Sequence, residues 1–171
     1  MAKKIALHNL GCPLNFAETS TLAEKFQERG YEQVPFNEKA DVYVINTCTV
    51  THEADRKSRR SVKKARKLNP EAKIVVTGCY AQVQPEKIAA LKGVDLILGN
   101  DEKFSIVNFI ENQSKNEGPE IYISDSDRML RFHPAYSLGD RTRSFLKVQN
   151  GCDYHCAYCT IPMARGKSRN P

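Results

Sequence analysis

Short apolar segments that alternate with helical stretches constrain the fold of this chain more than any other feature of its sequence. The segments KIALHNL, DVYVINT, KIVVTG and VDLILGN are rich in Val, Ile and Leu, as strands buried on both faces should be. YEQVPF is a candidate for a further strand. The alternation predicts an α/β fold: an open, mostly parallel sheet with helices on both faces, flavodoxin-like or of a related doubly wound kind.

Capping and breaking residues set the expected helix ends. The first helix should open at Asn15, with Glu18 answering it three positions later in a capping box, and close at Gly30. The second should span about residues 53–68, because the residue before Pro70 is pushed out of the helical region. Two further helices are expected near residues 85–91 and 103–111.

Composition limits the kind of protein. The chain has 171 residues, of which 40% are hydrophobic and 27% charged, which predicts a soluble chain with one complete domain and the beginning of a second. No apolar run approaches the about 18 residues that span a bilayer, and the first residues lack the pattern of a cleavable leader. We therefore expect a cytoplasmic protein that does not associate with membranes. The net charge of +6 favours an anionic partner.

Three widely spaced cysteines each follow an expected strand: Cys12, Cys48 and Cys79. Parallel strands deliver their following loops to one edge of a sheet, where ligands bind, so the three thiols should surround one crevice. Helix amino ends beyond them favour thiolates and an anionic cluster. Small buried thiols are the alternative, and the shared edge favours ligation. Gly11, Asn46, Thr47, Thr77 and Gly78 would then support the ligands.

Three more cysteines form the motif C-x3-C-x2-C in GCDYHCAYC: Cys152, Cys156 and Cys159. The spacing matches neither the paired knuckles of zinc ribbons nor the C-x2-C-x2-C run of ferredoxins. Three thiolates can hold three irons of a four-iron, four-sulfur cube and leave one iron open to a small molecule. His155 is a further potential ligand, although we favour an ordinary loop residue. FLKVQNG, before the motif, predicts a buried strand that begins a new domain.

The C-x3-C-x2-C loop resembles that of radical S-adenosylmethionine (SAM) enzymes, in which an aromatic residue, here Tyr158, typically precedes the last cysteine. The segments LGCPLNFAET, NTCTVTHEADRKSRR, VTGCYAQ and GDRTRSFLKVQNGCDYHCAYCTIPMARGKSR are similar to the methylthiotransferases among them. The resemblance implies an auxiliary four-iron, four-sulfur cluster for sulfur transfer on Cys12, Cys48 and Cys79. It implies a second cluster, which cleaves SAM, on Cys152, Cys156 and Cys159, with Tyr158 in cofactor binding.

Within that family, ADRKSRR, TGCYAQ and RTRSFLKVQNGCDY most resemble the branch that adds a methylthio group to C2 of N6-threonylcarbamoyladenosine beside the tRNA anticodon. Pro13 departs from it, because GCP is more familiar in the branch that modifies an aspartate of a ribosomal protein. The branch that acts on isopentenyladenosine in tRNA also stays open. A non-catalytic iron-sulfur or RNA-binding module is the alternative of another class. A flavodoxin-like electron carrier is disfavoured, since no phosphate-cradling loop follows the first strand.

The resemblance also implies cofactors and partners. One SAM donates a methyl group to sulfur at the auxiliary cluster, and a second is reductively cleaved to a radical that abstracts hydrogen from C2 of the base. The expected cofactors are therefore SAM and two four-iron, four-sulfur clusters. The expected partners are the tRNA anticodon stem-loop, an electron donor and a sulfur source, with no obligate protein partner.

A strongly basic helix bears on the choice of partner. Eight cations fall within twelve positions: Arg56, Lys57, Arg59, Arg60, Lys63, Lys64, Arg66 and Lys67. Only Val62, Ala65 and Leu68 remain to dock on the sheet. A solvated helix face is the ordinary reading of such a run. Like charges on one helix repel, however, and we favour compensation by tRNA phosphates.

The expected domain organisation follows from these motifs. Residues 1–114 should form the auxiliary-cluster domain, residues 115–144 a loosely packed linker with Arg141 and Arg143 exposed, and residues 145–171 the truncated start of a radical SAM partial β/α barrel. Only TIPMARGKSRNP follows the last cysteine. We therefore expect an amino-terminal fragment that does not turn over by itself and does not stably hold the second cluster.

Overall fold

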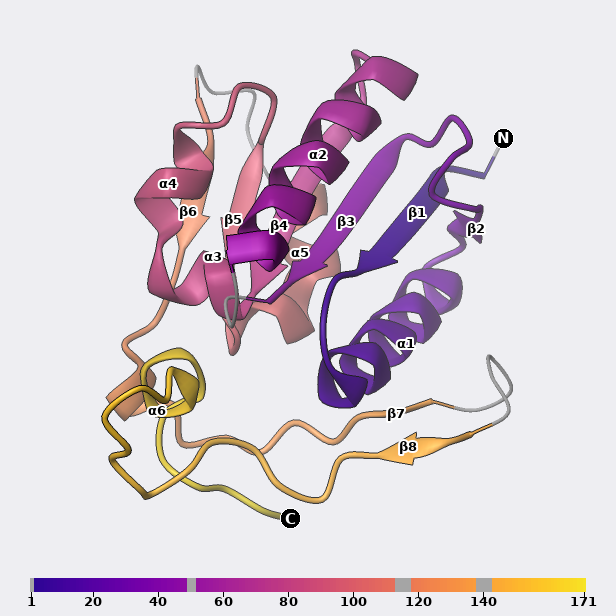
Figure 1. Cartoon of the computed structure of the whole chain (residues 1–171). Helices are drawn as coiled ribbons and strands as arrows, with labels where there is room; N and C mark the ends of the chain where they lie inside the picture. Colours follow the sequence, from indigo (N-terminus) through magenta and orange to yellow (C-terminus); the bar gives the residue numbers. More distant parts are fainter. Residues whose placement is uncertain (1, 49–51, 113–117, 138–142) are drawn as a thin grey trace.

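The computed structural model describes residues 2–48, 52–112, 118–137 and 143–171. Figure 1 shows a sheet flanked by helices, with the last part of the chain lying below the arrowheads of the central strands. The sheet has six parallel strands in the order β2-β1-β3-β4-β5-β6. These strands are β1 (Lys4–Asn9), β2 (Glu32–Gln33), β3 (Val42–Thr47), β4 (Lys73–Gly78), β5 (Leu96–Leu98) and β6 (Glu120–Tyr122).

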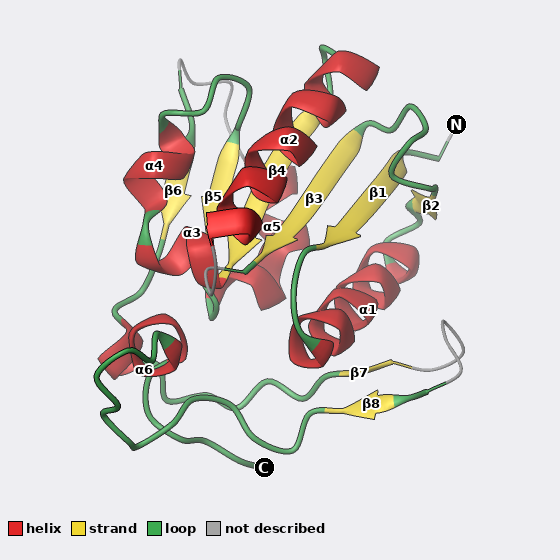
Figure 2. Cartoon of the chain, viewed as in Figure 1, coloured by secondary structure: helices red, strands yellow, loops and turns green. Residues whose placement is uncertain are grey.

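Helices cover both faces of this sheet (Figure 2). These helices are α1 (Pro13–Glu28), α2 (His52–Leu68), α3 (Cys79–Val83), α4 (Pro85–Ala89) and α5 (Ile106–Asn112), with the 3-10 helix η1 (Glu102–Ser105). The helix α6 (Ile161–Arg165) and the 3-10 helix η2 (Ser126–Arg128) lie beyond the carboxyl ends of the strands (Figure 2). A small antiparallel ribbon joins β7 (Tyr136–Ser137) and β8 (Phe145–Leu146). The predicted flavodoxin-like arrangement is confirmed, including the strand at YEQVPF.

The sheet separates two apolar cores. On one face Tyr43, Ile74 and Val76 of the central strands pack with Val62 and Ala65 of α2 and with residues of α3 and α4. On the other face, alternate residues of the same strands pack with α1, η1 and α5. Because inner parallel strands bury both faces, almost every side chain of β3 and β4 is buried. No helix within the described ranges is long and apolar enough to cross a membrane.

The start of α1 differs from the prediction. Cys12, not Asn15, is the N-cap residue, and Pro13 occupies the first helical turn, where its missing N–H costs nothing. Asn15 lies inside the helix, and its side chain donates to the carbonyl of Thr47 instead of capping. Glu18 forms no capping box, because its carboxylate is fully buried among cations. The predicted end is confirmed: Gly30 follows Arg29, the C-cap residue.

The segment after α5 also differs from the prediction. β6 adds a sixth strand to the sheet within the expected linker, and Met129, Ala135 and Ser137 of that linker are buried. The prediction of a loosely packed linker is therefore wrong for Met129, Ala135 and Ser137. Arg143 is exposed as expected, and Arg141 lies outside the described residues.

The predicted buried strand at FLKVQNG is wrong. Only Phe145 and Leu146 are extended in a ribbon, and they pair with β7. Leu146 and Val148 are exposed, whereas Lys147 between them is buried. Successive side chains of this segment point to opposite sides. Lys147 points inward because its ammonium donates to the buried carboxylate of Glu18, so its apolar neighbours Leu146 and Val148 point to the surface.

Candidate metal centre

The three widely spaced cysteines lie at the carboxyl ends of three adjacent parallel strands. Cys12 lies beyond β1 as the N-cap of α1, Cys48 directly follows β3, and Cys79 directly follows β4 as the first residue of α3. These strands are neighbours in the sheet, and Thr47 is paired with Gly78 at its end. The predicted common edge is therefore confirmed, with Cys12 exposed, Cys48 half-buried and Cys79 buried.

Convergence of the three sulfurs on one ligand stays a prediction. Among the residues that the structure describes, no group of three or more His, Cys, Asp or Glu side chains could hold a metal ion as placed. Cys48 directly precedes residues 49–51, which lie outside the described ranges.

The strand ends below these cysteines are tied together by buried polar groups. Asn46 donates to the carbonyl of Asn15 at 3.1 Å, and Asn15 in turn donates to the carbonyl of Thr47 at 3.0 Å. The Thr47 hydroxyl donates to the carbonyl of Thr77 at 2.5 Å. Gly78 has φ +97°, and an added Cβ would lie 2.3 Å from the Thr47 carbonyl oxygen, so only glycine fits before Cys79. Asn46, Thr47 and Gly78, which are expected to support the ligands, therefore fix the chain where it leaves β3 before Cys48 and where it leaves β4 before Cys79.

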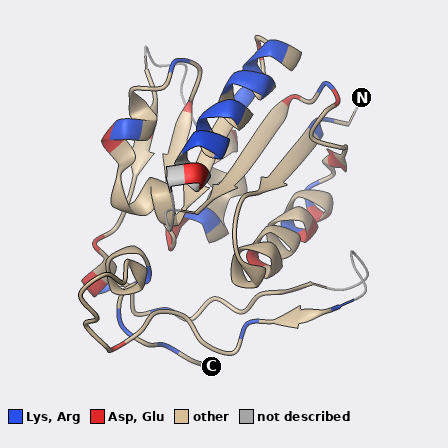
Figure 3. Cartoon of the chain, in the orientation of Figure 1, with Lys and Arg blue, Asp and Glu red and all other residues tan. Residues whose placement is uncertain are grey.

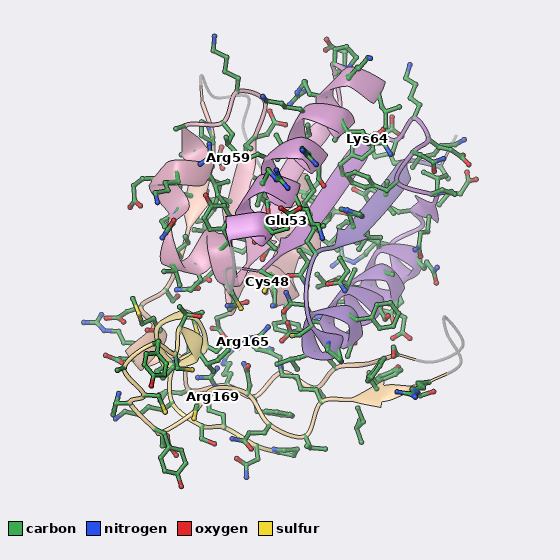
Figure 4. The ribbon with its side chains drawn as sticks, viewed as in Figure 1. Cys48, Glu53, Arg59, Lys64, Arg165 and Arg169 are labelled. Carbon is green, nitrogen blue, oxygen red and sulfur yellow. The ribbon has the colours of Figure 1, made fainter. Side chains whose placement is uncertain are left out.

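A buried group of four charged side chains lies beside this edge. The carboxylate of Glu18 on α1 accepts from Lys103 at 2.6 Å, Lys147 at 2.9 Å and Arg165 at 2.9 Å. All four side chains are at most 4% exposed. Figure 4 shows Arg165 on the same side of the sheet as Cys48. We call these residues the Glu18 cluster; three cations face one carboxylate, so its formal charge is +2.

Burial and mutual attraction compete in setting the pKa values of this cluster. Burial would raise the pKa of Glu18, but Lys103, Arg165 and Lys147 hold it well below its usual value. Burial lowers the pKa of Lys103 to about 8 against the attraction of Glu18. The pKa of Arg165 is raised above its usual value, because the attraction of Glu18 and Cys79 outweighs the effect of burial. The carboxylate is thus ionised at neutral pH, and the surplus in the cluster is positive.

Two residues connect the Glu18 cluster to Cys79. Asn100 accepts from the Lys103 ammonium at 2.8 Å, while its amide donates to the Cys79 sulfur at 3.7 Å and to the Ala164 carbonyl at 2.7 Å. Arg165 interacts with the Cys79 side chain as well as with Glu18. The surplus charge therefore borders the most buried of the three thiols.

The C-x3-C-x2-C loop is anchored on this same side of the molecule. Its base is closed by reciprocal hydrogen bonds between Asn150 and Arg169, both 2.8 Å, and by the Cys152 amide, which donates to the Gly166 carbonyl at 3.0 Å. After the loop, α6 packs beside α3, so the loop is more ordered at its base than the sequence predicted. At its tip Tyr158, the expected cofactor-binding residue, is 96% exposed. Cys156 is also exposed, with Cys152 and Cys159 half-buried.

The donor set fits an iron-sulfur cluster better than a hard cation. Thiolates are soft ligands that suit zinc and iron-sulfur clusters, whereas magnesium and calcium prefer oxygen. The loops after β1 and β3, which Asn15 and Asn46 link, place thiols after adjacent strands. The net positive charge of the Glu18 cluster matches an anionic ligand. Cys12, Cys48 and Cys79 are therefore suitable residues for such a group.

The sequence does not predict the Glu18 cluster. Its local pattern predicts a capping role for Glu18 and indicates no role for Lys103, Lys147 or Arg165, which the structure places around that carboxylate. One signal was present: a lysine interrupts the apolar pattern of FLKV, as an inward-facing cation would.

The basic helix α2 presents its cations on the outer surface, and Figure 3 shows them along its length. Arg56, Lys57, Arg60, Lys63, Lys64 and Lys67 are exposed. Arg66 is different, because its guanidinium donates to Asp95 and to the carbonyls of Ala72 and Gly93. Arg66 thus connects α2 to the neighbouring loops. Six of the eight predicted cations are exposed, whereas Arg59 and Arg66 are half-buried.

The fold and the site define a flavodoxin-like domain with thiols at the carboxyl edge of its parallel sheet. A comparison with known families matches residues 4–99 to the one described as "Uncharacterized protein family UPF0004", and the chain belongs to that family.

Among curated proteins, the chain is 43% identical over 169 residues to the threonylcarbamoyladenosine tRNA methylthiotransferase MtaB of Aquifex aeolicus (98% of this chain, 41% of the relative). It is 42% identical to the protein of that name from Bacillus subtilis (98% and 38%). It is 31% identical to the tRNA-2-methylthio-N(6)-dimethylallyladenosine synthase of Thermodesulfovibrio yellowstonii (98% and 39%). The chain thus spans about two fifths of the length of these relatives.

Proposed function

We propose that this chain is the amino-terminal part of a tRNA methylthiotransferase that adds a methylthio group to C2 of N6-threonylcarbamoyladenosine next to the anticodon. The names of the relatives in A. aeolicus and B. subtilis support the reaction and the nucleoside. The observation that carries the proposal is the position of Cys12, Cys48 and Cys79 after three adjacent parallel strands.

In this proposal each cysteine set has its own task. Cys12, Cys48 and Cys79 hold an auxiliary four-iron, four-sulfur cluster on the flavodoxin-like domain. Cys152, Cys156 and Cys159 hold a second one, with Tyr158 beside the cofactor. When bound, these groups supply sulfur transfer and reductive cleavage of SAM. The protein's part is to keep the strand-end thiols in register, through Asn46, Thr47 and Gly78, and to hold the second loop on the same side through α6.

The domain division expected from the sequence is part of the proposal. Residues 1–114 carry the auxiliary site, residues 115–144 cross over while contributing β6, and residues 145–171 begin the radical SAM domain. The 171 residues alone do not turn over, because the adenosine and methionine parts of SAM need further β/α units. The protein acts in the cytoplasm with an electron donor and a sulfur source.

The exposed cations of α2 are proposed as a contact for tRNA phosphates. Six exposed cations on one helix create a local positive potential that attracts a polyanion. Arg66 does not take part, because it is bound within the domain.

Anaerobic reconstitution with iron and sulfide tests the site. We expect Cys48→Ala to lose most of the bound iron and Cys156→Ala to lose little, because the loop around Cys156 is exposed at its tip whereas Cys48 leaves a buried strand. Both variants remove one thiol, so each is the control of the other. The second cluster is expected to be stable only in the whole enzyme, so for these 171 residues alone the reverse pattern, or about eight irons per wild-type chain, contradicts the prediction.

A chimaera tests the reaction. In the chimaera, this chain replaces the matching 169 residues of the A. aeolicus relative. The chimaera is produced in cells that lack their own tRNA methylthiotransferase, and the nucleosides of their tRNA are analysed by mass spectrometry. We expect 2-methylthio-N6-threonylcarbamoyladenosine, and none with Cys79→Ala. The 2-methylthio derivative of isopentenyladenosine instead would assign the chain to the second branch, which the T. yellowstonii relative keeps open. Neither derivative, from a folded chimaera, contradicts the proposal.

A further inference from the structure

The Glu18 cluster contains more positive charge than its own carboxylate can balance. Each ion taken out of water costs several kcal/mol unless an opposite charge offsets it. Asn15, Asn100 and Asn150 donate no negative charge; their side-chain oxygens accept from Arg165 and Lys103 as neutral dipoles. Among the residues that the structure describes, two of the three buried cations therefore have no counter-charge of their own.

The surplus is directed toward Cys79. Asn100 bridges Lys103 to the Cys79 sulfur, and Arg165 interacts with Cys79 directly. An anionic group attached to this sulfur would be a second negative charge near both cations, in addition to the Glu18 carboxylate. Neighbouring cations and N–H donors stabilise thiolates in this way.

We propose that Lys103, Lys147 and Arg165, arranged by Glu18, are the counter-charge of an anionic thiolate-ligated iron-sulfur group at Cys79. This inference rests on the proposed function and adds three positioning residues to the site. The cations act on the group through the electric field and, through Asn100, by a hydrogen bond to sulfur.

The arrangement couples the two parts of the chain. Lys147 and Arg165 come from residues 145–165, whereas Glu18 and Lys103 belong to the sheet domain. Any anion that binds beside all three cations stabilises the docking of residues 145–165, and docking in turn stabilises the anion, because linkage is reciprocal.

A purely structural role predicts a different response to mutation. Lys147 is the best position to probe, because Arg165 still donates to the same Glu18 oxygen, Oε1, when the lysine is gone. Lys147 also lies over the rings of Phe104 and Phe132, and methionine keeps a favourable contact with aromatic rings. Lys147→Met therefore removes the charge and little else.

The test compares Lys147→Met with Lys67→Met, an equal charge change on the exposed last turn of α2, in a Cys156→Ala background that silences the second loop. Without iron, we expect Lys147→Met to leave Tm unchanged or raise it, because one unbalanced cation is gone. After reconstitution, we expect it to lower the reduction potential by about 60 mV, a tenfold change for one electron, relative to Lys67→Met. Iron release to a chelator should also be faster.

A structural ion pair would give the opposite pattern. A lower Tm without iron for Lys147→Met, together with a potential equal to that of Lys67→Met, overturns the inference. If the Cys156→Ala chain takes up no iron, that result contradicts the proposed function. The Tm values without iron then test the charge surplus: a lower Tm for Lys147→Met than for Lys67→Met rejects it, and an unchanged or higher Tm supports it.

Discussion

Within residues 1–114, replacing Gly78 by alanine should lower the stability more than replacing any other glycine, because only at Gly78 would an added Cβ lie within 3 Å of backbone atoms. Gly78 has φ +97° and ψ −169°, a region that is almost restricted to glycine, so alanine costs about 1–3 kcal/mol in backbone strain. An added Cβ would lie 2.3 Å from the carbonyl oxygen and 2.7 Å from the nitrogen of Thr47. These are backbone atoms of β3 and cannot rotate away, which adds about 1–3 kcal/mol of overpacking.

Gly30→Ala is the matched control. Gly30 also has positive φ, +78°, but nothing lies within 4 Å of an added Cβ, so only the left-handed strain of about 1–2 kcal/mol applies. We expect Gly78→Ala to lose about 1–4 kcal/mol more free energy of unfolding than Gly30→Ala. For a chain of this size the difference corresponds to about 2–16 °C in Tm.

Urea unfolding followed by circular dichroism measures both variants, and an unchanged m value confirms that the same surface unfolds. Because Gly78 directly precedes Cys79, the variant should also retain less iron after reconstitution. Equal losses of stability in the two variants, within about 0.5 kcal/mol, would refute the steric reasoning.

Three further predictions concern charged residues outside the Glu18 cluster. Lys63→Glu should weaken binding to a tRNA anticodon stem-loop several-fold and reduce the salt dependence of log K by about 1–2, as measured in a salt titration. Arg66→Gln should lower the free energy of unfolding by about 1–3 kcal/mol, because carbonyls of Ala72 and Gly93 lose a charged donor. Burial lowers the pKa of His133 despite Asp101, so the unfolded chain binds the proton more readily, and stability should fall as pH drops below about 6.5.

Each of these has a control. Lys39→Glu changes an exposed charge that does not belong to α2 and should leave tRNA binding nearly unchanged, whereas an effect equal to that of Lys63→Glu would contradict a specific role of α2. Arg60→Gln, on the exposed face, should cost at most about 0.5 kcal/mol. His133→Gln should flatten the decline of Tm between about pH 7.5 and pH 5; the same slope in variant and wild type would show that other groups cause it.

The sheet and the edge that carries the first three cysteines were predictable because both depend on local patterns. Strands such as β3 and β4 are buried on both faces and each contains a continuous apolar run, VYVI and IVV, which is visible in the sequence. Once the strands are parallel, the residues after them share an edge. Cys48 and Cys79 therefore needed no knowledge of distant contacts.

The Glu18 cluster was not predictable in that way. Glu18 lies 85, 129 and 147 residues from Lys103, Lys147 and Arg165, and nothing in a window around any of them indicates the others. The local sequence around Asn15 and Glu18 also fits a capping box, and tertiary contacts overrode that preference. Lys147 lies in an apolar stretch whose pattern predicts a buried strand. The pattern therefore predicts burial for Leu146 and Val148, which the structure shows to be exposed.

The separation of these partners along the chain has a consequence for biosynthesis. Translation proceeds at about 5–20 residues per second, so Arg165 is made roughly 7–30 seconds after Glu18, which lies 147 residues earlier. During that interval the growing chain can assemble β1, β3 and β4, but Glu18 has Lys103 at most as a partner. Glu18 therefore gains the last two of its three cationic partners only after residues 145–165 have emerged from the ribosome, so this buried ion group stays incomplete until then.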